Sequence, residues 1–387
     1  MYKFDVIISG GGMVGAVCAN AMAAADFKVA MIEAAPQVSC QSDDERSLRV
    51  SAIADKHLNF FKALGIQAHI DGERMGYYQN MMVWDNHSRG HLDFTGDNGT
   101  DLGAIIENKW VVYAAQKKLQ NNDHVAVLYN HTIQSFEQSD RQVTVSLDNN
   151  ERLQGRLLIA CEGARSPLRE MAGITVRTNS YRQFAIVCYL QIENAPQRTA
   201  LQAFNHSGPV ALLPVKDDVF SLVWTCDEDY YQQWLDAEES HFIAGLQAHI
   251  RRDFGAIKVI SDRAAFPLRQ MYANETIQNR LVLLGDSAHV VHPLAGQGVN
   301  LGLSDVVELV RQIKDINLRD TEALKQALKR YYRRRQSEVL ATSELMSFLQ
   351  RFYAIDQPAL TWLRGTGMNL VNGFKPLKNW LVTQAGS

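Results

Sequence analysis

A glycine-rich turn near the N-terminus constrains this chain more than any other feature of the sequence. Residues 4–9 form a short apolar run, which predicts a buried parallel strand. Residues 10–15, GGGMVG, follow directly and fit the pattern G-x-G-x-x-G. The small side chains of 14–25 predict a helix packed closely on a sheet, and 28–32 predicts a second strand. The chain therefore begins as a β-α-β unit.

Three glycines and one acid give this unit the chemistry of a dinucleotide site. Gly10 permits the tight turn, Gly12 lets the backbone approach a pyrophosphate, and Gly15 allows close packing of the helix on the strand. Glu33 ends the second strand, where its carboxylate can accept hydrogen bonds from both ribose hydroxyls of an adenosine. Ordinary turns also use glycine, but here strand, turn, helix, strand and acid follow in the order that a dinucleotide site requires. The motif alone does not distinguish FAD from NAD.

Charge and hydropathy exclude two classes of protein. The net charge of −3 over 387 residues gives no global basic field, so we expect no nucleic-acid partner. No stretch approaches the roughly 20 apolar residues of a membrane-spanning helix, and the N-terminal apolar run is too short for a signal peptide. The five cysteines form no CxxC pair, which favours reduced thiols. We therefore expect a cytoplasmic protein, which can still lie peripherally at the inner face of a membrane.

The middle of the chain predicts a second, β-rich lobe. Valines spaced by two within 124–148 indicate a hairpin with one buried face. Further strands are predicted at Phe184–Ile192, Val210–Val215 and Val219–Cys226. After 281–284, another strand candidate, a helix is expected from Val299 onward. The last ~55 residues are predicted to be mostly helical. Breaks are expected there at Pro358, at Gly365 and Gly367, and at Pro376.

Two later motifs supply candidate cofactor contacts. The first is 161–169, CEGARSPLR, after a strand at 157–160, and the second is 285–305, GDSAHVVHPLAGQGVNLGLSD. Asp286, at a strand end, can accept hydrogen bonds from polyol hydroxyls. Pro293 stiffens the following loop, and Gly296 and Gly298 let backbone N–H groups approach a flat ring. The N-terminus of the next helix would stabilise negative charge on that ring.

These motifs resemble the class A flavoprotein monooxygenases, and within them the ubiquinone-biosynthesis hydroxylases. Residues 292–305 match the signature of that group at every position, and Arg49 begins a segment, RVSAI, that matches its early arginine motif. Asn108 falls where the group places a polar side chain that contacts the flavin. One position departs, because the motif that usually reads Ala-Asp-Gly is Cys161-Glu162-Gly163 here. The resemblance covers essentially the whole chain.

The resemblance implies an α/β fold of the para-hydroxybenzoate hydroxylase type. An FAD-binding Rossmann-like domain is expected over 1–76, 97–177 and 264–335, with an inserted β-sheet substrate domain over 77–96 and 178–263. A helical region, 336–387, completes the chain. The cofactor-binding residues that it implies or that the motifs supply are Gly10, Gly12, Gly15, Glu33, Arg49, Asn108, Glu162, Gly163, Gly285, Asp286, Gly298, Val299 and Asn300. Those expected around the reacting ring, as catalytic elements, are Pro293, Gly296, Gln297 and Gly298.

The activity implied is hydroxylation of the aromatic ring of a polyprenylated ubiquinone precursor, with FAD, NAD(P)H and O2. NAD(P)H is expected as a transient co-substrate, because the chain has no second G-x-G-x-x-G motif. The segment that begins Gly365-Thr366-Gly367 has Leu370 where this motif requires its last glycine. No general base is expected, since the cofactor performs the difficult chemistry. Two rivals are a hydroxylase of a small soluble phenol and a non-catalytic flavoprotein subunit of a ubiquinone-biosynthesis complex. The second is suggested by Glu162.

Several residues have an alternative reading. His289 and His292 could form a metal pair, but no third ligand is apparent, so we expect no metal. Cys161 is expected to be a small buried residue rather than a nucleophile. The basic run 329–335 is expected to be a solvated helix face, or else a contact with anionic lipid or with other ubiquinone-biosynthesis proteins. Four apolar residues could serve the same surface or pack in the core: Trp362, Leu363, Trp380 and Leu381.

Overall fold

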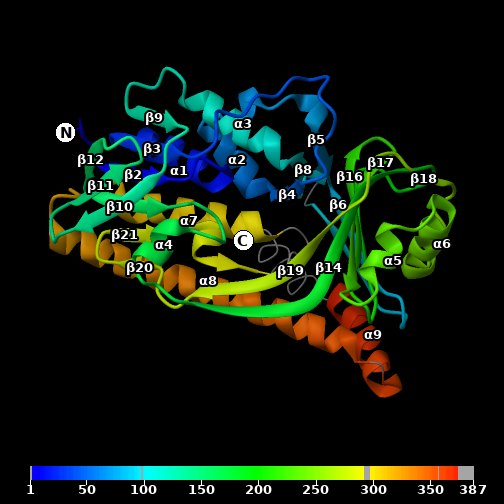
Figure 1. The fold of residues 1–387 in the computed structure, drawn as a ribbon. Helices are drawn as coiled ribbons and strands as arrows, with labels where there is room; N and C mark the ends of the chain where they lie inside the picture. The colour runs from blue at the N-terminus through cyan, green and yellow to red at the C-terminus, as the bar shows by residue number, and fades with distance from the viewer. Residues whose placement is uncertain (1, 97–98, 292–296, 356, 374–387) are drawn as a thin grey trace.

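The computed structural model describes residues 2–96, 99–291, 297–355 and 357–373, which form two lobes (Figure 1). The first lobe contains a six-stranded sheet in the order β20-β21-β13-β2-β3-β9, parallel except for β20. Its strands are β2 (Val6–Ser9), β3 (Val29–Glu33), β9 (Val125–Tyr129), β13 (Leu157–Ala160), β20 (Ile277–Gln278) and β21 (Leu281–Leu283). Every residue of β2, β13 and β21 is buried, as expected for strands covered on both faces.

Helices cover one face of this sheet and a small sheet covers the other. The helices are α1 (Met13–Ala24), α3 (Asn108–Leu119), α7 (Gln297–Ile313) and α8 (Thr321–Ala354), with α2 (Asp55–Ala63) beside them. The small sheet is β1 (Tyr2–Lys3), β12 (Arg152–Gly155), β11 (Val143–Leu147) and β10 (Ile133–Gln138). A three-stranded sheet, β4 (Val50–Ala54), β8 (Gly103–Glu107) and β5 (Met75–Tyr78), extends toward the second lobe. The β-α-β unit expected at the N-terminus is confirmed as β2-α1-β3.

The hairpin expected over 124–148 is only partly correct. β10 and β11 do pair as an antiparallel hairpin, but β9 pairs in parallel with β3 in the large sheet. Spacing by two marks a strand with unequal faces and does not specify the partner strand. β9 and β10 are consecutive in the chain and similar in sequence pattern, yet they belong to different sheets.

A nine-stranded sheet forms the second lobe. Its strands are β6 (Asn80–Asp85), β7 (His91–Thr95), β14 (Val176–Ile192), β15 (Thr199–Phe204), β16 (Val210–Lys216), β17 (Val219–Asp227), β18 (Ile257–Val259), β19 (Ala264–Ala273) and β22 (His289–Val290). The long strands β14 and β19 run side by side from the first lobe into the second, along α8 (Figure 1). The short α4 (Pro167–Met171) precedes β14. The strands predicted within 184–226 are confirmed.

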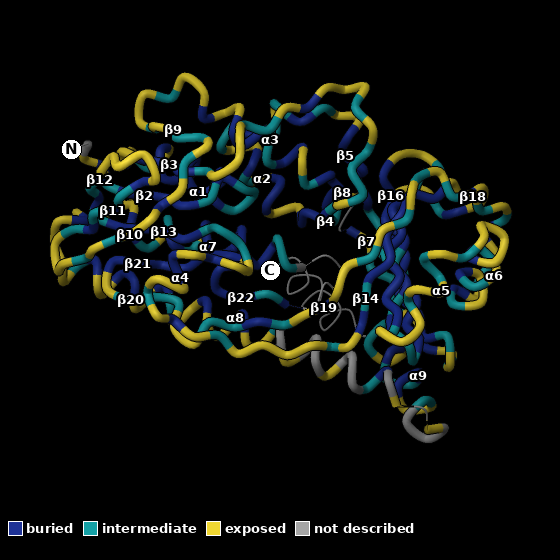
Figure 2. The backbone as a smooth tube through the Cα atoms, in the orientation of Figure 1, coloured by how far each residue is buried: buried dark blue, intermediate teal, exposed yellow. Residues whose placement is uncertain are grey.

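The two faces of this sheet have different neighbours. On the outer face lie α5 (Tyr231–Leu235) and α6 (Glu239–Ile250), which pack against Trp224 and Phe220 of β17. Alternate residues of the same strands point to the opposite face, toward β4 and β8 of the first lobe. Both sides of the central strands are deeply buried (Figure 2). The inner face therefore lies against the first lobe rather than against solvent.

The C-terminal helices differ from expectation at two glycines. The expected break at Pro358 is confirmed, since α9 (Pro358–Gly373) begins there, but α9 continues through Gly365 and Gly367. A Cβ at Gly365 would lie 2.9 Å from Ser88 Oγ, and a Cβ at Gly90 would lie 2.8 Å from Gly365 Cα. Glycine here lets the helix approach the β6–β7 turn closely. The expected break at Pro376 lies outside the described residues.

A buried ion pair fixes α9 to the second lobe. Arg364 of α9 lies 3.4 Å from Asp85 of β6, and both side chains are fully buried. Arg364 also donates to the carbonyl oxygens of Phe352 and Ile355, which lie at the end of α8 and just beyond it. Within the described part of the chain, no helix combines the length and apolar character needed to cross a bilayer.

Candidate active site

Two cavities meet at a shared wall. The first, here the strand-end cavity, has a volume of about 580 Å³ and lies at the carboxyl ends of β2, β3 and β13. The second, here the inter-lobe cavity, has a volume of about 220 Å³ and lies between β4 and the inner face of the nine-stranded sheet. Arg49, Asp286 and Val299 line both cavities. A ligand that extends through both would pass these three residues.

The glycines of the first turn have separate steric roles. Gly10 has φ of +98°, and a Cβ there would lie 2.4 Å from the carbonyl oxygen of Cys161. A Cβ at Gly15 would lie 1.8 Å from the carbonyl oxygen of Gly10. A Cβ at Gly12 would meet no atom of the described part of the chain within 4 Å, and Gly12 lines the strand-end cavity. Gly10 and Gly15 therefore allow close packing of the backbone. Gly12 instead leaves open the space where a pyrophosphate would approach at the N-terminus of α1.

Glu33 and Glu162 are two carboxylates on the wall of the strand-end cavity. Glu33 accepts hydrogen bonds from the backbone N–H groups of Gly11 and Ala35, so the glycine turn itself orients this side chain. Glu162 accepts from the Ser9 hydroxyl at 2.6 Å, and also from the Ser166 hydroxyl and the Leu168 N–H. Because Ser166 caps α4, Glu162 joins the end of β2 to the start of that helix. The sequence did not reveal this contact.

Asp305 is the centre of a buried polar network that fixes the second glycine turn. It accepts hydrogen bonds from Gly285 N at 2.9 Å, His289 Nε2 at 2.8 Å and Arg335 Nε at 2.7 Å. Arg335 also donates to the carbonyl oxygen of Leu301, so α7, α8 and the turn are held together. Burial alone would raise the pKa of Asp305, but His289, Arg335 and these hydrogen bonds outweigh it and lower that pKa.

This network revises the reading of the basic run and gives His289 a role other than the metal pair that was rejected above. Arg335 belongs to the basic run 329–335, yet it is only 5% exposed, so the solvated-face interpretation is wrong for this residue. The interpretation is confirmed for Arg333 and Arg334, which are exposed. His289 contacts Asp305, whereas its proposed metal-binding partner, His292, lies outside the described residues.

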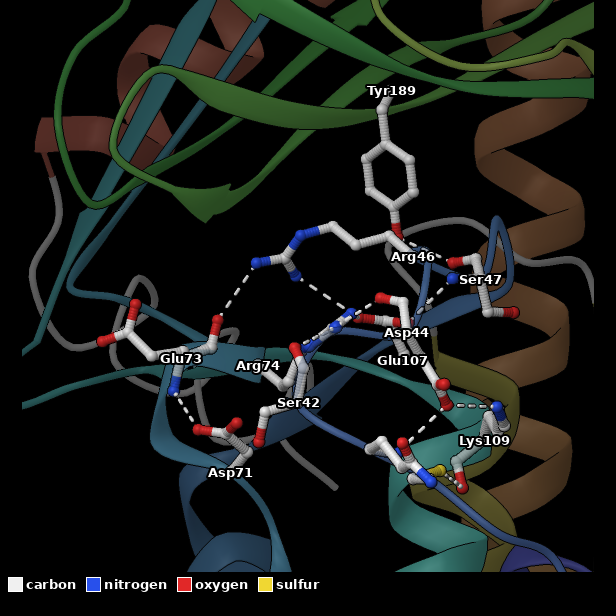
Figure 3. A network of polar contacts seen from close by, with 12 residues as sticks. Ser42, Asp44, Arg46, Ser47, Asp71, Glu73, Arg74, Glu107, Lys109 and Tyr189 are labelled. Carbon is white, nitrogen blue, oxygen red and sulfur yellow. Dashed lines mark hydrogen bonds and ion pairs between the residues drawn. The ribbon is translucent and has the colours of Figure 1, made fainter.

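Asp286 and Arg49 lie at the junction of the two cavities. The Asp286 side chain is accessible from the cavities, but the protein around it desolvates the carboxyl and raises its pKa, while the positive charges of His289 and Arg49 act in the opposite direction. The backbone at Arg49 is fixed by the contacts of the preceding loop (Figure 3). Ser47 N donates to Glu107 at 2.8 Å, and the Tyr189 hydroxyl of β14 donates to the carbonyl oxygen of Ser47 at 2.7 Å.

Glu107 holds that loop in place and was not predicted from the sequence. Besides Ser47, its buried carboxylate is paired with Arg74 at 3.1 Å and with Arg46 at 3.3 Å (Figure 3). In the sequence, Glu107, Arg46 and Arg74 resemble ordinary surface charges. No motif or regular spacing along the chain relates Glu107 to Arg46 or to Tyr189. Only the sheet contacts of β8 and β14 bring the three segments together.

The remaining predicted residues divide into three groups. Asn108, Gly298 and Val299 line the inter-lobe cavity, and Gly163 lines the strand-end cavity, where its N–H donates to Ser287. Asn300 is 2% exposed and lines neither cavity, because its side chain bonds the backbone of β4 at Ala52 and Ala54. Gly285 packs against Val14 of α1. Pro293 and Gly296 lie outside the described residues, and Gln297 is described only as the first residue of α7.

Cys161 is packed against the glycine turn. The residue is partly buried rather than part of the core, and desolvation raises the pKa of its thiol, which disfavours a role as a nucleophile. None of the five cysteines is in a disulfide. In the described part of the chain, no group of three or more His, Cys, Asp or Glu side chains has the arrangement of a metal site.

Comparison with known proteins agrees with this arrangement. Residues 3–344 match the FAD binding domain family. The chain is 31% identical to the mitochondrial ubiquinone biosynthesis monooxygenase COQ6 of Mus musculus, over 99% of this chain and 90% of that protein. It is 30% identical to the 3-demethoxyubiquinol 3-hydroxylase of Escherichia coli K12, over 94% of this chain and 93% of that protein. The p-nitrophenol 4-monooxygenase PnpA of Pseudomonas putida has the same fold, with a TM-score of 0.77 and 17% identity over 100% of this chain and 99% of that one.

The fold and the site therefore define an FAD-dependent monooxygenase. The chain belongs to the family of flavin hydroxylases that includes these two ubiquinone-biosynthesis enzymes. The inferred fold class, the FAD cofactor and the aromatic-hydroxylase class are thereby confirmed.

The two roles of glycine predict different outcomes for two matched substitutions. Gly12→Ala places a methyl group in open space, so the protein should fold normally but bind FAD at least about tenfold more weakly. Gly15→Ala forces a methyl group onto the Gly10 carbonyl, so it should fail to fold. Melting temperature without added FAD and equilibrium dialysis with FAD measure the two effects. Normal FAD affinity in Gly12→Ala would contradict this assignment.

The Asp305 network predicts a pH-dependent stability. Asp305→Asn should destabilise the protein by about 3–5 kcal/mol near neutral pH, because Arg335 remains buried without its carboxylate. A carboxyl whose pKa is lowered on folding stabilises above its unfolded pKa and loses that effect as the pH falls through its folded pKa. The difference in melting temperature should therefore shrink in acid. Asp217→Asn, in an exposed turn, is the control, and a pH-independent difference would count against the network.

Proposed function

We propose that this chain hydroxylates the aromatic ring of a polyprenylated ubiquinone precursor, using FAD, NAD(P)H and O2. The observation that supports this most is the junction at Arg49, Asp286 and Val299, where a cavity with a dinucleotide-type turn opens into a small, mostly apolar cavity. The names of the two relatives support the pathway. The volume of about 220 Å³ suits a single ring, since pockets for larger ligands have about 300–1,000 Å³.

We also propose the residues that hold FAD. Gly10, Gly12 and Gly15 would accommodate the pyrophosphate at the N-terminus of α1, Glu33 the adenosine ribose, and Asp286 the polyol chain. The open space beside Gly12 and the approach at Gly298, where a Cβ would also meet no atom of the described residues within 4 Å, fit such a group. Others that would line it are Arg49, Asn108, Glu162, Gly163, Val299 and the start of α7 at Gln297. When bound, FAD accepts a hydride from NAD(P)H and activates O2.

The chain itself would position the ring and exclude water. Val187, Ala211 and Val223 give the inter-lobe cavity an apolar wall, which keeps water from the reacting centre. Among the described residues that line this cavity, only Arg49 and Asp286 are ionisable. None of these described lining residues is a histidine or lysine that could act as a general base. The catalytic contribution of the protein would lie in orientation and in the exclusion of solvent.

Two rival functions make different predictions. A hydroxylase of a small soluble phenol shares the fold, as the p-nitrophenol enzyme shows, but that likeness extends to fold alone. A non-catalytic flavoprotein subunit would bind FAD without oxidising NAD(P)H. The contacts of Glu162 with Ser9, Ser166 and Leu168 suit a structural acid that leaves the cofactor site intact, so Glu162 no longer gives a reason to prefer the non-catalytic subunit.

We further propose that α9 contacts a membrane surface, where a polyprenylated substrate resides. Trp362 and Leu370 are each 70% exposed and Leu363 is 51% exposed. The only charged residue of this helix, Arg364, is buried against Asp85, so the exposed side of α9 carries no charge. An uncharged helix side with tryptophan and leucine is typical of a segment that lies in the interface of a bilayer.

The proposed activity has a direct test. The purified holoenzyme should oxidise NAD(P)H faster when a 2-prenylphenol is added, and mass analysis should find product one oxygen heavier. In cells, deletion of the gene should lower ubiquinone and accumulate an intermediate that lacks one oxygen. Normal ubiquinone with active turnover of small phenols would favour the first rival, and absence of NAD(P)H oxidation with every phenol would favour the second.

The membrane proposal predicts a loss of vesicle binding. Trp362→Gln together with Leu370→Gln should weaken sedimentation with phosphatidylglycerol-containing vesicles by at least about tenfold, because two large apolar side chains no longer enter the interface. Tyr230→Gln, which changes a residue that is 57% exposed elsewhere, is the control. Equal binding by the double variant and the wild type would contradict the proposed contact.

A further inference from the structure

Two polar residues, Gln202 and Thr225, lie in the otherwise apolar wall that the nine-stranded sheet gives the inter-lobe cavity, and Gln202 has the longer side chain. Four residues form a row across neighbouring strands of the nine-stranded sheet: Gln202, Ala211, Val223 and Val187. All four line the cavity, and all but Gln202 are apolar. Leu201 and Ala203, on either side of Gln202 in β15, point the other way into the outer core with Trp224. The alternation of the strand therefore directs the Gln202 side chain into the cavity.

Gln202 is a buried residue whose side-chain amide opens to the cavity and has no hydrogen-bond partner among the described residues. The residue is 6% exposed, and the small surface that its amide keeps faces the cavity, where no described side chain or backbone group bonds it. Buried amides are otherwise satisfied in folded proteins, because an unpaired amide keeps the cost of its lost hydration. Asn300, also buried, shows the usual arrangement, since both ends of its amide bond the backbone of β4. The exception at Gln202 lies where a ligand would supply the missing partner.

We propose, building on the proposed function, that Gln202 binds and orients the phenolic hydroxyl of the substrate ring. Its amide oxygen can accept a hydrogen bond from a phenol, and its amide nitrogen can donate one to a phenolate. The contact comes from the sheet side of the cavity, opposite Gly298, Val299 and Asn108, which come from the first lobe. A polar contact from the sheet side of a mostly apolar pocket restricts the rotation of a ring, and this rotation determines which ring carbon faces the cofactor.

The binding contribution follows from a comparison of two probes. Wild-type holoenzyme should bind 2-prenylphenol about tenfold more tightly than prenylbenzene, measured from the change in absorbance of bound FAD. Gln202→Met keeps the size of the side chain but removes the amide. This variant should bind the two probes with nearly equal affinity and leave the affinity for prenylbenzene unchanged. Its yield of hydroxylated product per NAD(P)H consumed should also fall, because the ring is no longer held in one rotation.

The melting temperature of Gln202→Met distinguishes a binding role from a merely structural role. A structural role predicts that the melting temperature falls, whereas the proposal predicts that it does not. Because Gln202→Met removes an unpaired buried amide, its melting temperature should equal or exceed that of the wild type. Gln202→Asn retains the amide but withdraws it by one methylene, so its preference for the phenol should be intermediate. Gln191→Met, at an exposed position of β14 in the same sheet, is the matched control and should match the wild type in every measurement.

The possible outcomes distinguish a failure of the proposed function from a failure of the role proposed for Gln202. If the wild type binds neither probe, the proposed function itself is wrong. If the wild type prefers the phenol and Gln202→Met keeps the same preference, the ring hydroxyl is bound elsewhere and the role of Gln202 is overturned. A lowered melting temperature in Gln202→Met, with its preference intact, would identify a structural residue. Loss of the preference in a stable variant supports the proposal.

Discussion

The buried carboxylate of Asp305 holds together three segments that are far apart in the sequence. It pairs with His289 and Arg335 and accepts the N–H of Gly285, so the second glycine turn, α7 and α8 form one rigid unit. That turn carries Asp286, and α7 begins at the wall of the inter-lobe cavity. The junction of the two cavities therefore depends on an ion pair that touches neither. A buried pair of this kind contributes mainly by fixing one arrangement, since the cost of desolvation offsets much of its attraction.

A second constraint comes from the nine-stranded sheet, which faces two environments. Its outer side is covered by α5 and α6, and its inner side forms the wall of the inter-lobe cavity. Alternation along each strand lets one set of residues build a core while the intervening set shapes a pocket. Tyr189 belongs to the inner set, and its hydroxyl holds the loop before Arg49. The same sheet thus shapes the proposed ring site and helps to position a residue of the cofactor site.

Local sequence predicted the parts of the fold whose signals are local. The β-α-β unit, the strands within 184–226 and the start of α9 at Pro358 follow from apolar runs, glycine turns and proline, which act over a few residues. The pairing of β9 with β3 was not predicted, because strand pairing depends on partners distant in sequence. The reading of Gly365 failed for a related reason. Glycine is needed at residue 365 because the β6–β7 turn lies very close to the helix there, and no residue near Gly365 in the sequence indicates this contact.

The sequence by itself determined the dinucleotide-type turn, the family and the residue types available to a flavin. Glycines and strand-end acids are recognisable there because their spacing along the chain is itself the requirement. Only the tertiary structure decided that Glu162 joins β2 to α4, that Asn300 bonds β4, and that Gln202 faces an apolar cavity. These roles depend on which segments pack together and on whether a buried polar group finds a partner. Long-range packing sets both, and it leaves no pattern in the spacing of residues.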